Sequence, residues 1–196
     1  MRDFALRLDT TRCPEGVEIV RGDIFSYRSD REERVVREAL DLESPLVTRY
    51  VNARDDDKRI DFLSCFGLPL ATKFIFSPYP STSRLIIEGG QKQLRRILTR
   101  AGSGDAARAA DAANEALASA GNSRLSQNAG RMVATLQNVF GFMCVEVALA
   151  AMNGDRLASC KWCRDVFLIG PRTNRRATAK FCKDLCRVKW NRAKST

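Results

Sequence analysis

The 196-residue sequence contains no histidine. Histidine is the commonest general base in enzymes and a frequent neutral ligand of metal ions. Its absence excludes Ser-His-Asp and Cys-His catalysis and every metal-dependent nuclease that needs a histidine base. The acidic cluster Asp55-Asp56-Asp57 has no base or nucleophile paired with it, and acids are common where a helix begins. We therefore expect no enzymatic activity, and we expect any tetrahedral metal site to consist of cysteines.

The sequence also lacks a hydrophobic run that we expect to cross a membrane. Residues 132–152 are long enough and largely apolar, but they include Gln137, Asn138 and Glu146. A carboxylate at the centre of a bilayer is costly, so a buried core helix is the better interpretation. Asp3 follows Met1 closely, and no apolar run comes after it, which is unlike a secretory signal. We expect a cytoplasmic protein with no membrane partner.

Negative charge is scarce at one end of the chain only. The net charge is +10, yet residues 1–155 contain 21 Lys/Arg and 21 Asp/Glu, which cancel. Residues 156–196 contain 12 Lys/Arg and only 2 Asp. A step of this kind indicates a boundary between two parts with different tasks. We predict a regulatory or dimerisation domain over residues 1–155 and a basic domain over residues 156–196.

The predicted fold class is mainly α within α+β, with a helical first domain that has a short β-hairpin at its start. Short β-prone segments within residues 4–28 predict one or two hairpins. Apolar periodicity and capping residues predict helices over residues 29–40, 55–67, 84–102, 106–121 and 123–152. The Gly89-Gly90 pair would weaken the third of these helices at its centre.

Four of the seven cysteines form two closely spaced pairs. Cys160 and Cys163 have the spacing C-x2-C, and Cys182 and Cys186 have the spacing C-x3-C, with 18 residues between the pairs. Two chelating pairs from different parts of a chain supply the four ligands of a tetrahedral zinc site. The wider spacing places Cys182 and Cys186 on one face of the first turn of a helix. We predict that these four cysteines bind one structural zinc ion.

The residues around the cysteines predict a small treble-clef-like zinc finger. Residues 165–170 are β-prone and would pair near Phe181, and a helix would carry the last two ligands. Phe167, Phe181 and Trp190 would form the core, with Trp190 covering the metal side of the helix. So little apolar material, in a segment of roughly forty residues, would need a metal ion in order to fold.

Two other roles for the cysteines remain as alternatives. A disulfide framework would require an oxidising compartment, which no signal peptide indicates. Unrelated core cysteines would seldom fall into two short pairs. The other cysteines, Cys13, Cys65 and Cys144, are dispersed along the chain. We expect Cys65 and Cys144 to lie in the hydrophobic core.

The basic side chains near the cysteines are the candidate nucleic-acid contacts. They are Arg172, Arg175, Arg176, Lys180, Lys183, Arg187, Lys189, Arg192 and Lys194. Cations that neutralise phosphates release counterions, so we expect salt-sensitive binding, to DNA rather than RNA. One alternative is a basic face that only keeps the protein in solution. The other alternative is a module with a structural zinc finger that binds an acidic protein partner, or a second copy of the chain to form a homodimer.

The C-terminal segment resembles the zinc finger of CGNR-type proteins, a family described as bacterial transcription regulators. The matching elements are Cys160-x2-Cys163, Phe167, Arg175-Arg176, Phe181-Cys182 and the basic residues from Cys186 onward. The sequence after Cys186 is Arg187-Val188-Lys189, where that family has Gly-Asn-Arg. The resemblance implies a helical N-terminal domain, a zinc finger and a role as a DNA-binding transcription regulator.

Overall fold

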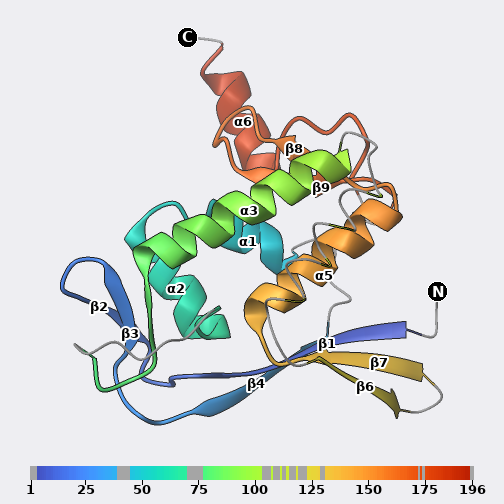
Figure 1. Cartoon of the computed structure of the whole chain (residues 1–196). Coiled ribbons are helices and arrows are strands. Elements are labelled where there is room, and N and C mark those ends of the chain that lie inside the picture. The colour runs from blue at the N-terminus through green and yellow to red at the C-terminus, as the bar shows by residue number, and fades with distance from the viewer. Residues whose placement is uncertain are drawn as a thin grey trace.

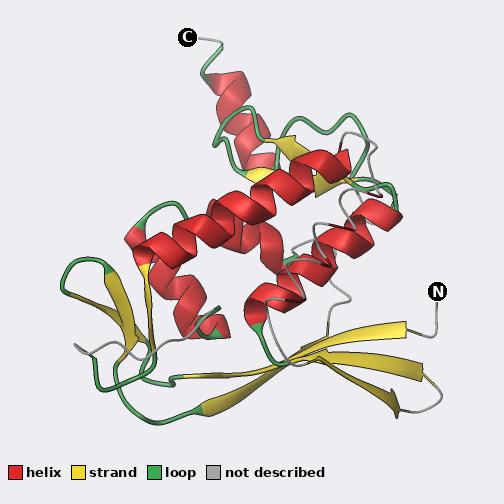
Figure 2. Ribbon diagram, viewed as in Figure 1, coloured by secondary structure: helices red, strands yellow, loops and turns green. Residues whose placement is uncertain are grey.

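The computed structural model of the chain describes residues 4–38, 45–69, 77–102, 123–128, 131–171, 173 and 175–194, and the single residues 107, 111, 114 and 118. The described strands form three sheets, of four, three and two strands, and helices pack between them (Figures 1 and 2). The fold is therefore mixed α+β, and the prediction of a mainly helical protein is wrong. Two of the predicted helical segments contain strands instead of helix over part of their length.

The four-stranded sheet joins distant parts of the chain. It consists of β1 (Phe4–Arg12), β4 (Glu33–Glu38), β6 (Ser123–Asn128) and β7 (Arg131–Leu136), in the order β4-β1-β7-β6. The central pair, β1 and β7, is parallel, whereas β1–β4 and β6–β7 are antiparallel. Parallel pairing requires a long crossover connection, and here helices α1 to α3 lie within that crossover.

The helix predicted over residues 29–40 is wrong, because residues 33–38 form strand β4. Two ion pairs link β4 to β1: Arg12 to Glu33 at 2.8 Å and Arg34 to Asp9 at 2.5 Å. Cross-strand pairs of opposite charge stabilise a sheet, and the adjacent β-branched Val35 and Val36 favour a strand. The partner strand lies more than twenty residues away, so local periodicity could not reveal it.

The single long helix predicted over residues 123–152 is also wrong. The chain forms the β6–β7 hairpin first and then helix α5 (Val139–Met152). Asn138 separates the two, because its Oδ1 accepts hydrogen bonds from the backbone N–H groups of Phe140 (2.7 Å) and Gly141 (3.1 Å). A side-chain acceptor of this kind starts a helix. None of the described helices combines the length and the apolar character needed to span a bilayer.

Other local predictions are confirmed. Strands β2 (Val17–Val20) and β3 (Ile24–Tyr27) form a hairpin, and β5 (Ser81–Ser83) extends it to the three-stranded sheet β2-β3-β5. Helices α2 (Asp56–Phe66) and α3 (Arg84–Gly102) lie within the predicted ranges. The helix predicted over residues 106–121 falls outside the described residues, except for Ala107, Asp111, Asn114 and Ala118, which are helical.

Helix α1 (Leu46–Asn52) was not predicted, and it lies at the centre of the fold. It packs against α3 and α5, and its residues Leu46, Val47 and Tyr50 are buried. The carboxylate of Glu146 on α5 is 4% exposed and accepts hydrogen bonds from the N–H groups of Leu46 (3.1 Å) and Val47 (2.8 Å). This side chain satisfies the first donors of α1 and joins α1 to α5.

The C-terminal residues form the two-stranded sheet of β8 (Arg156–Ser159) and β9 (Val166–Ile169), followed by helix α6 (Asp184–Arg192). β9 pairs with β8 and not with the residues around Phe181, so the expected treble-clef-like arrangement is wrong. In Figure 1 the β8–β9 hairpin lies beside α3, and α6 projects from the body of the protein. Leu157, Val166 and Leu168 pack against the main core.

The Gly89-Gly90 pair does not interrupt α3, and the two glycines have different surroundings. A Cβ atom at Gly89 would have no other group within 4 Å. A Cβ atom at Gly90 would lie 3.0 Å from Cε2 of Phe140 and 3.1 Å from the hydroxyl oxygen of Tyr50. Gly90 therefore allows α3 to approach α1 and α5 closely, whereas Gly89 only lowers helix propensity.

These surroundings predict opposite responses to alanine. We expect Gly89→Ala to raise the free energy of unfolding by about 0.5–1 kcal/mol, because alanine favours a helix. We expect Gly90→Ala to leave it unchanged or lower it, because the new methyl group crowds Phe140 and Tyr50. Urea unfolding of both variants measures the difference. Equal stabilisation by the two substitutions would contradict the close approach at Gly90.

Candidate metal centre

The first pair of cysteines lies in the turn between β8 and β9. The Cys160 N–H donates to the Asp165 carbonyl oxygen (2.8 Å), and the Arg164 N–H donates to the Cys160 carbonyl oxygen (3.0 Å). Arg164 has a φ of 64°, in the left-handed region, which reverses the chain tightly before β9 begins. These bonds close the turn and place the Cys160 and Cys163 side chains in the same cluster.

The second pair lies at the start of α6. Cys182 precedes the helix, Lys183 is its N-cap residue, and Cys186 belongs to its first turn. The Cys186 N–H donates to the Lys183 carbonyl oxygen (3.1 Å). The Lys161 N–H donates to the Lys180 carbonyl oxygen (3.0 Å), which ties the chain before Cys182 to the first cysteine turn. Cys182 and Cys186 were expected to lie on the same helical turn. Cys186 lies in the first turn of α6, but Cys182 precedes the helix.

The four sulfur atoms converge. All four lie within 4.8 Å of one another, with Cys163 and Cys182 3.4 Å apart and Cys182 and Cys186 3.6 Å apart. These separations far exceed the roughly 2.05 Å of a disulfide bond, and all seven cysteines are free. Sulfurs about 2.3 Å from a tetrahedral metal ion lie about 3.8 Å apart. The cluster has the size and the donor set to hold one metal ion.

The acidities of the thiols differ. Burial disfavours ionisation of Cys160, but the backbone N–H groups of Cys182, Cys163 and Trp162 outweigh it and lower the pKa of Cys160 to about 6. Burial raises the pKa of Cys163 to about 11, and burial together with the other three thiols raises the pKa of Cys182. Cys160 is thus the most acidic of these three thiols. A cation bound between the sulfurs would favour the thiolate forms of the other two.

The packing around the sulfurs is slight. Cys160, Phe167 and Ile169 form a small buried cluster of their own, and the other three cysteines, with Phe181, pack against it. Trp190 lies against Phe181, with 6.1 Å between the ring centroids. No residue of α6 is buried. The cysteines are therefore both the candidate ligands and much of the core of this region.

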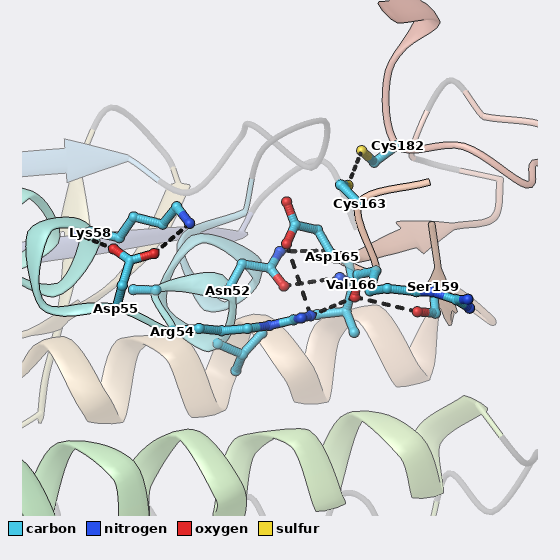
Figure 3. Close-up of polar contacts among 12 residues, drawn as sticks. Asn52, Arg54, Asp55, Lys58, Ser159, Cys163, Asp165, Val166 and Cys182 are labelled. Carbon is cyan, nitrogen blue, oxygen red and sulfur yellow. Dashed lines mark hydrogen bonds and ion pairs between the residues drawn. The ribbon is translucent and has the colours of Figure 1, made fainter. Parts of the chain in front are cut away.

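Asn52 and Arg54 attach the turn between β8 and β9, here called the cysteine turn because it contains Cys160 and Cys163, to the rest of the protein (Figure 3). The Asn52 amide donates to the Val166 carbonyl oxygen (2.8 Å) and accepts from the Val166 N–H (2.9 Å). The Arg54 guanidinium donates to the Arg164 carbonyl oxygen (2.5 Å) and lies 3.9 Å from the Asp165 carboxylate. Sequence reasoning missed both residues, because no local pattern marks a contact across more than a hundred residues.

The structure brings four of the predicted nucleic-acid contacts together. Arg175, Lys180, Lys183 and Arg187 line a groove of about 400 Å³ that also touches Cys182. Arg176, Lys189, Arg192 and Lys194 are exposed outside this groove, and Arg172 lies outside the described residues. The groove is thus basic and borders the metal centre.

Three of the basic side chains have specific neighbours. Arg175 is half-buried, and its guanidinium lies 5.1 Å from the centre of the Phe167 ring. Arg187 forms an ion pair with Asp184 at 3.1 Å, and the Lys194 ammonium lies 5.3 Å from the Trp190 ring. Arg175 therefore also supports the small core, whereas Lys180 and Lys183 are exposed at the groove.

The three cysteines outside the cluster differ in burial. Cys144 is buried, as expected, and Cys13 is buried too, but Cys65 is exposed, so its predicted place in the core is wrong.

Comparisons of the chain with family models, with curated proteins and with solved structures found no match.

Two cysteine substitutions test the metal centre. We expect Cys182→Ser to lose bound metal, because serine removes one of four sulfur donors at the middle of the cluster. Cys65→Ser is the matched control: it removes an exposed thiol outside the cluster and should leave the metal content unchanged. Native mass spectrometry of both variants and of the unaltered protein measures the bound metal. Equal metal content in the two variants would contradict the assigned centre.

Proposed function

We propose that the four cysteines bind one structural zinc ion and that the basic groove beside them binds nucleic acid, DNA first of all. The observation that carries the proposal is the position of the groove. Four cations gather around a cavity that touches a candidate metal ligand. A metal ion bound by the cysteines would therefore fix the backbone that presents these cations.

Zinc is the metal ion that best fits the donor set. Four sulfur donors in a compact cluster are typical of structural zinc sites, and iron is the other metal found with this geometry. A site with four protein ligands has no open position for a substrate or a water molecule, which favours a structural role. The small core around the sulfurs supports this role, because metal binding can supply folding energy that packing does not.

The charge of the region supports nucleic acid as the partner. Residues 156–196 contain 12 Lys/Arg and 2 Asp, and helix α6 exposes its basic side chains on a segment that projects from the body. A dense cluster of cations binds phosphates by releasing counterions, independently of the base sequence. The resemblance to CGNR-type proteins supports a transcription regulator in the cytoplasm, with residues 1–155 as the regulatory or dimerisation part.

A pair of lysines tests the groove. We expect the unaltered protein to bind duplex DNA with an affinity that falls steeply as salt is added. The double variant Lys180→Gln, Lys183→Gln should bind about tenfold more weakly at low salt, with a log–log salt slope shallower by about 1–2 units. Fluorescence anisotropy of a labelled duplex measures both quantities.

The control removes the same charge elsewhere. Arg28 and Arg31 are exposed and follow strand β3, far in the chain from the four clustered cysteines. The double variant Arg28→Gln, Arg31→Gln should bind like the unaltered protein. If the unaltered protein shows no salt-sensitive binding, the proposed function is wrong. If both double variants weaken binding equally, only net charge matters and the groove has no special role.

A second candidate function is self-association. Leu185 (61% exposed) and Val188 (39% exposed) are large apolar residues three positions apart on α6. Apolar side chains grouped on a projecting helix favour an interface with a protein, here a second copy of the chain. Sedimentation velocity of the metal-loaded protein and of Leu185→Ser, Val188→Ser tests this. A dimer that the double variant abolishes would support it, and a monomer in both cases would exclude it.

A further inference from the structure

A second basic groove lies on the N-terminal part of the protein. It follows α3 from Glu88 to Arg100 and has a volume of about 580 Å³. Four cations line it: Lys92, Arg95, Arg96 and Arg100. None of the described residues that line it belongs to residues 156–196, so this groove is separate from the one beside the cysteines.

The cancellation of charge over residues 1–155 conceals this groove. Residues 89–104 contain four Lys/Arg and no Asp/Glu. Among the described residues that line the groove, Glu88 is the acid, and it forms an ion pair with the buried Arg59 at 2.9 Å. Arg59 therefore offsets much of the negative charge of Glu88, which would otherwise offset the cations of the groove. The described part of the groove keeps a local excess of positive charge.

The cations are placed to meet a ligand from solution. Lys92, Arg96 and Arg100 are exposed. Arg95 is half-buried and donates a hydrogen bond to the Val51 carbonyl oxygen, which holds it against α1. Burial, and then the charge of Arg54, lower the pKa of Arg95. An anion bound beside Arg95 would favour its charged form.

The groove is connected to the cysteine region. Helix α3 packs against β8, the strand that leads to Cys160 (Figure 1). Arg54, whose charge acts on Arg95, donates a hydrogen bond to the Arg164 carbonyl oxygen in the cysteine turn. The two basic grooves therefore belong to parts of the protein that contact each other directly.

We propose that the α3 groove binds the phosphate backbone of the same nucleic acid that the cysteine region binds. This inference rests on the proposed function. From Lys92 to Arg100 the helix rises about 12 Å, and successive phosphates of one DNA strand rise about 3.4 Å each, so the groove spans several phosphates. A row of cations along a helix matches a repeating polyanion.

A small anionic ligand fits the groove less well. Sites for small molecules use a few fixed polar groups to orient the ligand. The buried polar side chain of this groove is Gln91, and its amide already donates to the carbonyl oxygens of Tyr50 (2.8 Å) and Ala53 (2.8 Å). The exposed cations of the groove are on long side chains, which suit phosphates better than a shaped ligand.

The test uses the full chain and a double variant, Lys92→Gln, Arg96→Gln. Fluorescence anisotropy with a labelled duplex should show binding about tenfold weaker at low salt and a salt slope shallower by about 1–2 units. The double variant Arg28→Gln, Arg31→Gln is the matched control and should bind like the unaltered protein. Urea unfolding of each variant establishes that both are folded.

The possible results separate this inference from the proposed function. If the Lys180, Lys183 variant loses affinity and the Lys92, Arg96 variant does not, the proposed function stands and the α3 groove is no part of the interface. If the unaltered protein does not bind duplex DNA, both proposals fall. If pyrophosphate binds the unaltered protein at micromolar concentration and not the Lys92, Arg96 variant, the groove takes a small anion and the inference is overturned.

Discussion

The convergence of four cysteine sulfurs is the constraint on which the C-terminal region depends. Sulfur atoms within 4.8 Å of one another cannot all carry negative charge unless a cation lies between them. Backbone N–H groups lower the pKa of Cys160 to about 6 in spite of its burial, whereas burial raises the pKa of Cys163 to about 11. A metal ion held by the four cysteines would resolve this conflict and would link the β8–β9 turn to α6. Without it, a core of a few side chains would have to hold the region together.

The second constraint is the attachment of this region to the helices. Asn52 forms two hydrogen bonds with Val166, and Arg54 binds the turn between Cys163 and β9. Asn52 and Arg54 lie at and just beyond the end of α1, whose beginning is held by the buried carboxylate of Glu146. Thus the position of the cysteine turn depends on α1, and α1 depends on α5. These contacts join residues 1–155, in which the charges cancel, to the basic residues 156–196.

How much of this was predictable depends on the range of the interactions. The cysteine pairs, α2 and α3 were predicted because spacing, caps and periodicity are local signals. Strand β4 and the β6–β7 hairpin were missed because β4 and β7 pair with β1, which lies far from both in the sequence. The apolar spacing from Met132 to Met143 fits a helix as well as a strand followed by a helix, and only pairing with β1 decides between them.

The two basic surfaces also differ in how easily the sequence reveals them. Counting charges along the chain identified residues 156–196, but summing over residues 1–155 concealed the cations of α3, since acids elsewhere in that segment cancel them. The treble-clef-like prediction failed because β9 has a nearer partner, β8, across the cysteine turn. Residues that attach one element to another, such as Asn52, carry no signal of their own in a single sequence.

X-ray absorption spectroscopy at the zinc edge of the purified protein tests the central claim most directly. The account predicts one zinc ion per chain with four sulfur neighbours at about 2.3 Å and no nitrogen or oxygen in the first shell. A spectrum with oxygen or nitrogen ligands, or a protein that folds fully without any metal, would contradict it.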